Sequence, residues 1–236
     1  MTRFVLHTQQ LSDTLKEDVA AMTGAYAADL HRFGFSTMLP ANHLLLMYQH
    51  CLAWEVVSYL DRIGVMPEAP TELITAHDDS DMLIGYVLYL PAPTHPDACG
   101  VSYMAVDDQN RGRGIAKEMM ELVKKRYPHV ELTCSPAKVP YYQSMGFKMI
   151  DWESTQLVMN TRDMSSEGQI AIQDVDPIYN SKQAHDIFMQ MVKTYGEKAM
   201  RNDQKRLKKH IAEASRRAKA FFQANSAVKS KADYRS

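Results

Sequence analysis

The segment with the clearest chemical potential is a glycine-containing turn at Gln109–Lys117, between a predicted strand and a predicted helix. Gly112 and Gly114 have no Cβ, so the backbone can approach an anion closely. The first N–H groups of the following helix lack partners inside the helix and lie at the positive end of its dipole. Arg111 and Arg113 add positive charge at the same turn. This pattern is suited to a diphosphate, which can accept several N–H groups at once.

A second segment lies thirty residues downstream, where Tyr141–Phe147 reads as a short helix that passes through Gly146 into a strand. The three-glycine dinucleotide fingerprint and the GxxxxGK[ST] loop are both absent, so neither a nicotinamide fold nor a P-loop is supported. The pattern Q-x-x-G-x-G after one strand and Y-x-x-x-G-F after the next resembles the GNAT superfamily of acyl-CoA-dependent N-acetyltransferases. The resemblance covers residues 1–160.

The resemblance implies acetyl-CoA as co-substrate and assigns it to particular residues. In that family the strand before the glycine turn splays from its neighbour, and its free backbone groups pair with the pantetheine arm, here at Met104, Ala105 and Val106. The pyrophosphate would rest on the amides of the turn, namely Arg111, Gly112, Arg113, Gly114, Ile115 and Ala116. Tyr142 is similar to the residue that protonates the departing thiolate. A phenol with a pKa near 10 suits that donation.

The implied reaction is direct attack of a deprotonated amine on the thioester within a ternary complex, with backbone donors near the splayed strand stabilising the oxyanion. The family often places a carboxylate on the strand before the turn, but residues 100–106 contain none. The route of the amine proton therefore stays open among Asp97, His95 and Glu131, acting through water.

Other residues favour structural interpretations. Tyr141 is expected to pack, and packing is also the alternative for Tyr142. Cys134 lies where the acetyl group should arrive, yet a small buried thiol is the commoner role. The nine histidines are scattered without a paired spacing, so no metal site is expected. Three widely spaced cysteines favour no disulfide framework and predict a reducing, cytoplasmic environment.

Composition is that of a globular protein, with 27 Lys and Arg against 28 Asp and Glu in 236 residues. The charge is unevenly distributed: residues 165–236 hold 14 basic against 8 acidic side chains, and residues 1–164 hold 13 against 20. No apolar run has the length of a membrane span, so no membrane partner is expected. The acidic first part favours a cationic acceptor.

Hydrophobic spacing predicts the element order β-α-α-β-β-β-α-β-α-β-β over the first 160 residues, an α/β (α+β) fold with a mixed, mostly antiparallel sheet flanked by helices. The expected strands are 3–8, 72–77, 82–90, 99–106, 130–134, 147–150 and 156–160. The expected helices are 11–33, a second from Pro40 to Gly64, 115–127 and 139–145. A loop is expected at 91–98.

Residues 161–236 are predicted to form a helical, basic extension of a 1–160 acetyltransferase domain, with the last dozen residues frayed. Apolar positions in the extension recur in a narrow seam, from Ala184 to Tyr195 and from Met200 to Phe221. Such a seam suits docking on the chain itself or in a homodimer. Nucleic-acid contact through the exposed basic residues and a solvated, silent helix are the alternatives.

Two functions follow from these observations. The first is a cytoplasmic N-acetyltransferase that moves an acetyl group from acetyl-CoA to a primary amine, on a small molecule, a protein lysine or an N-terminus. The second is a non-catalytic acyl-CoA-binding module that acts through its basic helix on nucleic acid or a protein. The missing strand carboxylate keeps the second alternative open.

Overall fold

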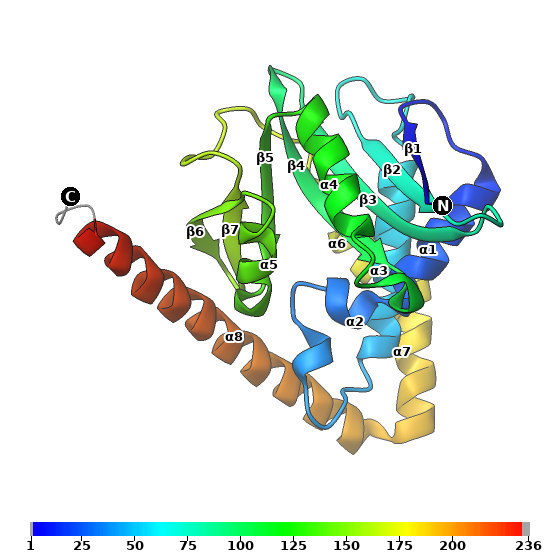
Figure 1. Ribbon diagram of the computed structural model, residues 1–236. Helices are drawn as coiled ribbons and strands as arrows, with labels where there is room; N and C mark the ends of the chain where they lie inside the picture. The colour runs from blue at the N-terminus through cyan, green and yellow to red at the C-terminus, as the bar shows by residue number, and fades with distance from the viewer. Residues whose placement is uncertain (1, 233–236) are drawn as a thin grey trace.

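The computed structural model describes residues 2–232 and the side chains of residues 2–226. Within this range seven strands form one sheet in the order β1-β2-β3-β4-β5-β7-β6 (Figure 1). Every neighbouring pair is antiparallel except β4 and β5, which are parallel. The strands are β1 Arg3–His7, β2 Glu72–His77, β3 Leu83–Ala92, β4 His95–Val106, β5 His129–Cys134, β6 Lys148–Glu153 and β7 Gln156–Asn160. The mixed, mostly antiparallel α/β fold predicted from the sequence is confirmed.

Helices cover both faces of this sheet. Helix α4 lies on one face, and α1 and α3 lie on the other (Figure 1). The helices are α1 Asp13–Ala25, α2 Ala27–Leu30, α3 Leu45–Leu60, α4 Ile115–Arg126, α5 Val139–Gln143, α6 Asp176–Tyr179, α7 Lys182–Tyr195 and α8 Glu197–Ala232. Short 3₁₀ turns η1 Phe35–Thr37, η2 Asp108–Asn110 and η3 Pro136–Lys138 connect them. Ser12 and Ser181 accept the N–H groups of Leu15 and Ala184 and so cap the starts of α1 and α7.

The unit β4-α4-β5 forms the one parallel crossover in the described sheet, because a helix must carry the chain back before a parallel strand can pair. Pairing between the two strands is short: Ala98–Val101 lies opposite His129–Leu132. Beyond that point β4 stays with β3 as far as Val106, while β5 continues beside β7. The two strands therefore diverge at the centre of the sheet.

A bulge in β4 changes which way its side chains face. The register against β3 shifts between Val101 and Tyr103, leaving Ser102 as the extra residue. After the bulge, Tyr103 and Ala105 pack in the cluster under α1 and α3. Met104 instead packs in the cluster under α4, as Val101 does before the bulge.

Three expected boundaries are wrong. The loop expected at 91–98 is a tight hairpin, in which β3 runs to Ala92, β4 starts at His95 and these two residues pair directly. The second helix starts at Leu45 rather than near Pro40, because the Asn42 side chain accepts the Leu44 N–H and begins a turn there. The helix expected over 11–33 is divided at Tyr26 into α1 and α2.

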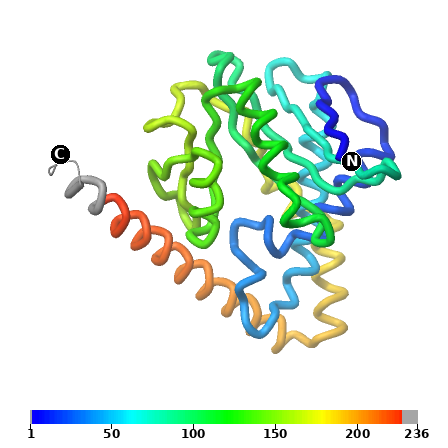
Figure 2. Tube along the Cα trace, in the orientation of Figure 1, coloured from blue at the N-terminus to red at the C-terminus, as the bar shows by residue number. Residues whose placement is uncertain are grey.

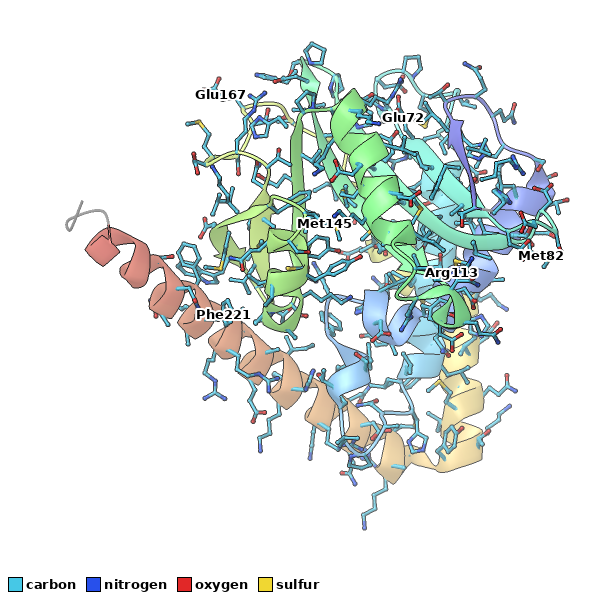
Figure 3. The ribbon with its side chains drawn as sticks, viewed as in Figure 1. Glu72, Met82, Arg113, Met145, Glu167 and Phe221 are labelled. Carbon is cyan, nitrogen blue, oxygen red and sulfur yellow. The ribbon has the colours of Figure 1, made fainter. Side chains whose placement is uncertain are left out.

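The extension packs on the rest of the chain. Its seam residues Met191, Met200 and Leu207 are buried against Phe35, Met38 and Leu44. Farther along α8, Ala218 joins the cluster under α4 and α5, and Figure 3 shows Phe221 beside this end of the sheet. The tube in Figure 2 shows α8 running from the foot of α7 along one side of the molecule. Docking on the chain itself is thus observed, whereas the homodimer stays a prediction.

Helix α8 continues to Ala232, although the last dozen residues were expected to be frayed. The final four residues of that expectation lie outside the described range. The division into a 1–160 domain and an extension also stays a prediction, because the two parts share buried clusters.

Candidate active site

The glycine turn at the start of α4 is exposed and open. Gly112 and Gly114 have φ of 78° and 82°, values that glycine adopts without strain. Apart from the adjoining residues, no described atom lies within 4 Å of a Cβ built at either glycine. The first helical hydrogen bond of α4 runs from the Glu118 N–H to the Gly114 carbonyl, so the N–H groups of residues 115–117 have no partner in the helix. The turn is a backbone cradle that an anion can enter.

The two arginines of the turn behave differently. Arg113 donates to Asn110 Oδ1 at 2.5 Å and stands at the N-terminal end of α4 (Figure 3). The Arg111 side chain turns back, with its guanidinium 4.9 Å from the ring centre of Tyr26 and its Nε 3.2 Å from the Val106 carbonyl. Arg113 is the freer cation beside the cradle, and Arg111 links the turn to β4.

The backbone that leads to this turn is paired on one edge only. Met104, Ala105 and Val106 pair with β3 at Val87, Tyr86 and Gly85. In the described part of the chain no strand pairs with their other edge, because β5 diverges from β4 after Val101. Apart from the Val106 carbonyl, which accepts from Arg111, main-chain groups on this edge are available to an extended ligand arm, as a strand edge is to an added strand.

Tyr142 lies on α5 beside the end of β5, with its side chain in the cluster under α4. Its ring is edge-on to Tyr141 at 5.3 Å and to Phe147 at 5.9 Å. Burial, with smaller contributions from Cys134 and Tyr141, raises the pKa of Tyr142 well above its usual range. No described residue bonds its hydroxyl, yet every fully shielded side-chain N or O in the described residues has a partner. The hydroxyl is therefore not fully shielded, and its raised pKa keeps it a protonated donor.

Cys134 is buried at the end of β5, and burial raises the pKa of its thiol to about 12. A thiol that stays protonated at neutral pH is a poor nucleophile. Its environment favours the structural interpretation of this residue.

A cleft of about 670 Å³ opens on the face of the sheet that carries α3, where β4 and β5 diverge. Strand residues on its floor include Tyr103, Glu131 and Thr133, and α3 contributes Glu55 and Tyr59. The glycine turn precedes α4, which covers the opposite face. Neither the turn residues nor Met104–Val106 line the cleft, so the described residues form two distinct sites near the divergence, one of backbone N–H groups and one of side chains.

Glu55 is a residue that the sequence analysis missed. It is 8 % exposed, and its Oε1 accepts the Tyr103 hydroxyl at 2.5 Å. Burial raises the pKa of Glu55, although the hydrogen bond from Tyr103 and the nearby Arg32 oppose that shift. The available signal was a charged residue on the apolar face of α3, three positions after Leu52 and four before Tyr59.

The three candidates for the proton route lie in different places. Asp97 is at the surface, where it binds Arg162 at 2.6 Å, and this hydrogen bond lowers its pKa. His95 contacts Thr94 in the hairpin turn and does not line the cleft. Glu131 lines the cleft and accepts a hydrogen bond from Asn160 at 2.9 Å. The structure brings Glu131 and Glu55 together around the cleft and leaves the other two outside it.

The segment between β7 and α6 forms one wall of this cleft. Ile170 packs so closely on Gly100 that a Cβ there would lie 2.5 Å from its Cδ1. The Gln173 N–H donates to the Tyr59 hydroxyl at 2.9 Å, and its side-chain oxygen accepts from Ser58 at 2.5 Å. The first part of the extension is therefore fixed to α3 and β4.

No group of three or more described His, Cys, Asp or Glu side chains is placed to hold a metal ion. No described helix combines the length and apolar character needed to cross a membrane.

Comparison with known proteins identifies one family model, the acetyltransferase (GNAT) domain, which matches residues 55–166. No curated protein sequence matches the chain. Among solved structures the chain is similar to Escherichia coli ElaA, at 14 % identity over 69 % of this chain and 100 % of that one, with a TM-score of 0.47. It is also similar to an acyl-CoA N-acyltransferase from Pseudomonas aeruginosa, at 18 % identity over 69 % and 100 %, with a TM-score of 0.46.

A nourseothricin acetyltransferase shares 19 % identity with a TM-score of 0.35. That alignment covers 38 % of this chain and 64 % of the other, so the chain spans less than two thirds of that protein.

Proposed function

Because this chain carries a GNAT acetyltransferase domain and belongs to the GNAT superfamily, we propose that it is an N-acetyltransferase that moves an acetyl group from acetyl-CoA to a primary amine. The observation that carries the proposal is the divergence of β4 from β5 directly before an open cradle of N–H groups. This arrangement allows a long ligand to lie along β4, with its phosphates at the turn and its reactive end at the cleft.

The residues that would hold acetyl-CoA fit it. The free edge of Met104–Val106 would pair with the pantetheine arm, and the amides of residues 111–116 would receive the diphosphate. Acetyl-CoA supplies an activated thioester. As the acceptor nitrogen forms its bond to the acetyl carbon, the bond from that carbon to sulfur breaks. The Tyr142 hydroxyl would donate its proton to the sulfur and recover one from the new amide nitrogen.

The lining of the cleft supports a cationic acceptor. Its described charged side chains are four carboxylates, from Glu55, Glu131, Glu153 and Asp176, against one arginine, Arg32. Carboxylates grouped around a cleft raise the local concentration of cations. Several tyrosine rings beside them offer faces on which an ammonium group can rest. A polyamine, an aminoglycoside-like compound or a lysine-rich peptide has this chemistry.

The test is a thermal shift with acetyl-CoA followed by release of free thiol with a panel of primary amines. We expect acetyl-CoA to raise the melting temperature and at least one polycationic amine to release thiol. Gly114→Asp should abolish the shift, because an acidic side chain at the cradle repels the diphosphate.

Gly196 offers a matched control for this variant. It follows α7 with φ of 83°, nearly the value at Gly114, and nothing lies near its Cβ position. Gly196→Asp places the same charge away from the cradle, and its backbone (φ 83°, ψ 149°) penalises an Asp side chain at least as strongly as the backbone at Gly114 (φ 82°, ψ −2°). It should keep the acetyl-CoA shift, and equal loss in both variants would contradict the proposed phosphate site.

The non-catalytic module remains the second candidate, favoured by the exposed basic face of α8, which includes Lys205, Lys208, Arg216 and Arg217. An acetyl-CoA shift without turnover on any amine would favour it. Salt-sensitive retention of nucleic acid, lost when these four residues are neutralised, would favour a nucleic-acid partner.

A further inference from the structure

We infer that Glu55, held by Tyr103, is the group that accepts the proton of the acceptor's ammonium ion. This inference rests on the proposed function, because it assigns the base of that reaction. The stretch of β4 beside the cleft carries no carboxylate that could act as this base. Glu55 of α3 supplies a carboxylate beside this stretch, bonded to Tyr103 of β4.

The geometry of Glu55 leaves one oxygen for the acceptor. Oε1 accepts the Tyr103 hydroxyl at 2.5 Å, and no described residue donates to Oε2. The described residues include no Lys, Arg or His ion pair to this carboxylate. A half-bonded carboxylate without a cation, 8 % exposed at the wall of a cleft, is costly unless a positive ligand or a proton completes it. An ammonium group supplies both.

Tyr103 is the positioning residue. It lies one residue before Met104, at the start of the free edge of β4, so its hydroxyl fixes Glu55 beside the point where the thioester would arrive. Burial, and after it the nearby Glu55, raises the pKa of Tyr103 well above its usual range, so this hydroxyl remains the donor in the pair. The negative charge, and with it the ability to take a proton, stays on Glu55.

The groups that face Glu55 come from every element around it. Its own helix contributes Cys51 and Tyr59, β4 contributes Tyr103, α6 contributes Tyr179, and the chain after α2 contributes Arg32. The tyrosines and the thiol are neutral at physiological pH, so Arg32 is the one charged neighbour among them. Burial therefore keeps the pKa of Glu55 above its usual range, closer to the pH at which a base is useful.

The proposed step balances simply. An N–H bond of the ammonium breaks, its electron pair stays on nitrogen, and the proton forms an O–H bond on Glu55. The free amine then reacts as described above, and Glu55 releases its proton to solvent after product leaves. One proton is released for each acetyl group transferred.

The test compares Glu55→Gln with wild type at pH 9 on two acceptors. An alkylamine with a pKa of about 10.4 is still protonated there, whereas an amino-acid amide with a pKa near 8 is already a free amine. We expect the variant to lose about 100-fold in kcat on the alkylamine and only a few-fold on the amide. Glu17→Gln, which removes an exposed carboxylate on α1, should match wild type on both.

Tyr103→Phe gives a second, independent readout. Loss of its hydrogen bond removes an interaction that lowers the pKa of Glu55, so the acid limb of the kcat profile should move to higher pH. Equal losses on both acceptors, or an unmoved acid limb, would overturn this inference and leave the proposed function standing. Wild type that releases no thiol with any amine would overturn the proposed function and this inference with it.

Discussion

At the scale of single residues, the surroundings of a side chain decide its role in the candidate site, and two residues of the same type can have different roles. Tyr142 and Tyr103 are both buried tyrosines with raised pKa values, but their partners differ. The Tyr142 hydroxyl has no described partner and can give its proton to a ligand, whereas the Tyr103 hydroxyl is engaged by Glu55. The sequence motif identified the first tyrosine. The second has no motif, because its role depends on Glu55, which lies on a helix 48 residues earlier in the chain.

Tyr142→Phe is expected to lower kcat by about 10- to 10³-fold while the acetyl-CoA dissociation constant stays nearly unchanged. The substitution removes the proton donor but keeps the ring contacts to Tyr141 and Phe147. Steady-state kinetics and calorimetric binding measure the two quantities. Tyr141→Phe, on the neighbouring half-exposed ring, is the control. A parallel loss of acetyl-CoA binding would refute the general-acid role.

His31 makes a prediction about pH and stability. It is 7 % exposed among the rings of Phe33, Phe35 and Tyr48, and burial, with a smaller effect of Arg32, lowers its pKa to about 3. The unfolded chain has a histidine pKa of about 6.5, so it binds the proton more readily than the folded protein does. The stability from a neutral His31 is present above pH 6.5 and is lost as the pH falls.

At pH 5 this loss amounts to about 2 kcal/mol relative to pH 7. Urea unfolding at both pH values should therefore show a smaller acid destabilisation in His31→Phe than in wild type. If stability depends on pH identically in the two proteins, burial does not lower the pKa of His31.

At the scale of elements, α4 must be held precisely because it carries the cradle at its N-terminal end. Its other end is fastened to the sheet by a buried polar cluster. Glu72 of β2 accepts two hydrogen bonds from Arg126, at 2.7 and 2.8 Å, and one each from Tyr89 and Tyr127. A bidentate pair of this kind fixes direction as well as distance.

Arg126→Met should destabilise the fold by about 1–3 kcal/mol, because Glu72 would keep its burial and lose its cation. Denaturant unfolding followed by circular dichroism gives the free energy of unfolding. Arg126→Lys keeps the positive charge without the two-bond geometry, so its free energy of unfolding should lie between those of wild type and Arg126→Met. Wild-type stability in Arg126→Met would mean that the cluster does not hold α4.

The element order of the first 160 residues was predictable because its signals are local: alternation for strands, three- and four-residue spacing for helices, and glycine or proline at the ends. The errors fall where local signals compete. The prolines at 91, 93 and 96 suggested a loop, yet Pro91 and Pro96 lie within β3 and β4 around a two-residue turn. The bulge at Ser102 and the place of Glu55 depend on pairing between distant segments. No local pattern encodes them.

At the scale of the whole molecule, the extension is a structural part of the cleft. Residues 166–180 contribute Ile170, Gln173 and Tyr179 to its lining, and the helices that follow pack on η1, α3 and the outer strands. The charge asymmetry of the sequence therefore does not mark two separate bodies. It separates an acidic cleft from the exposed basic face of α8.

This arrangement predicts that loosening α8 will affect the acceptor and not acetyl-CoA. Leu207 is 5 % exposed between α8 and the cluster of Phe35 and Met38, so Leu207→Lys places a charge in an apolar contact and should detach the helix. The wall that leads into α7 would lose its support, and the KM for the amine should rise severalfold. The cradle is formed by β4 and α4, so the acetyl-CoA dissociation constant should not change.

Lys205→Ala, at an exposed position on the same helix, should leave both constants at their wild-type values. Faster cleavage of the extension by protease would confirm that the helix has detached. If the KM for the amine is nevertheless unchanged, the cleft does not depend on the extension. A rise in both constants would show instead that the whole fold depends on α8.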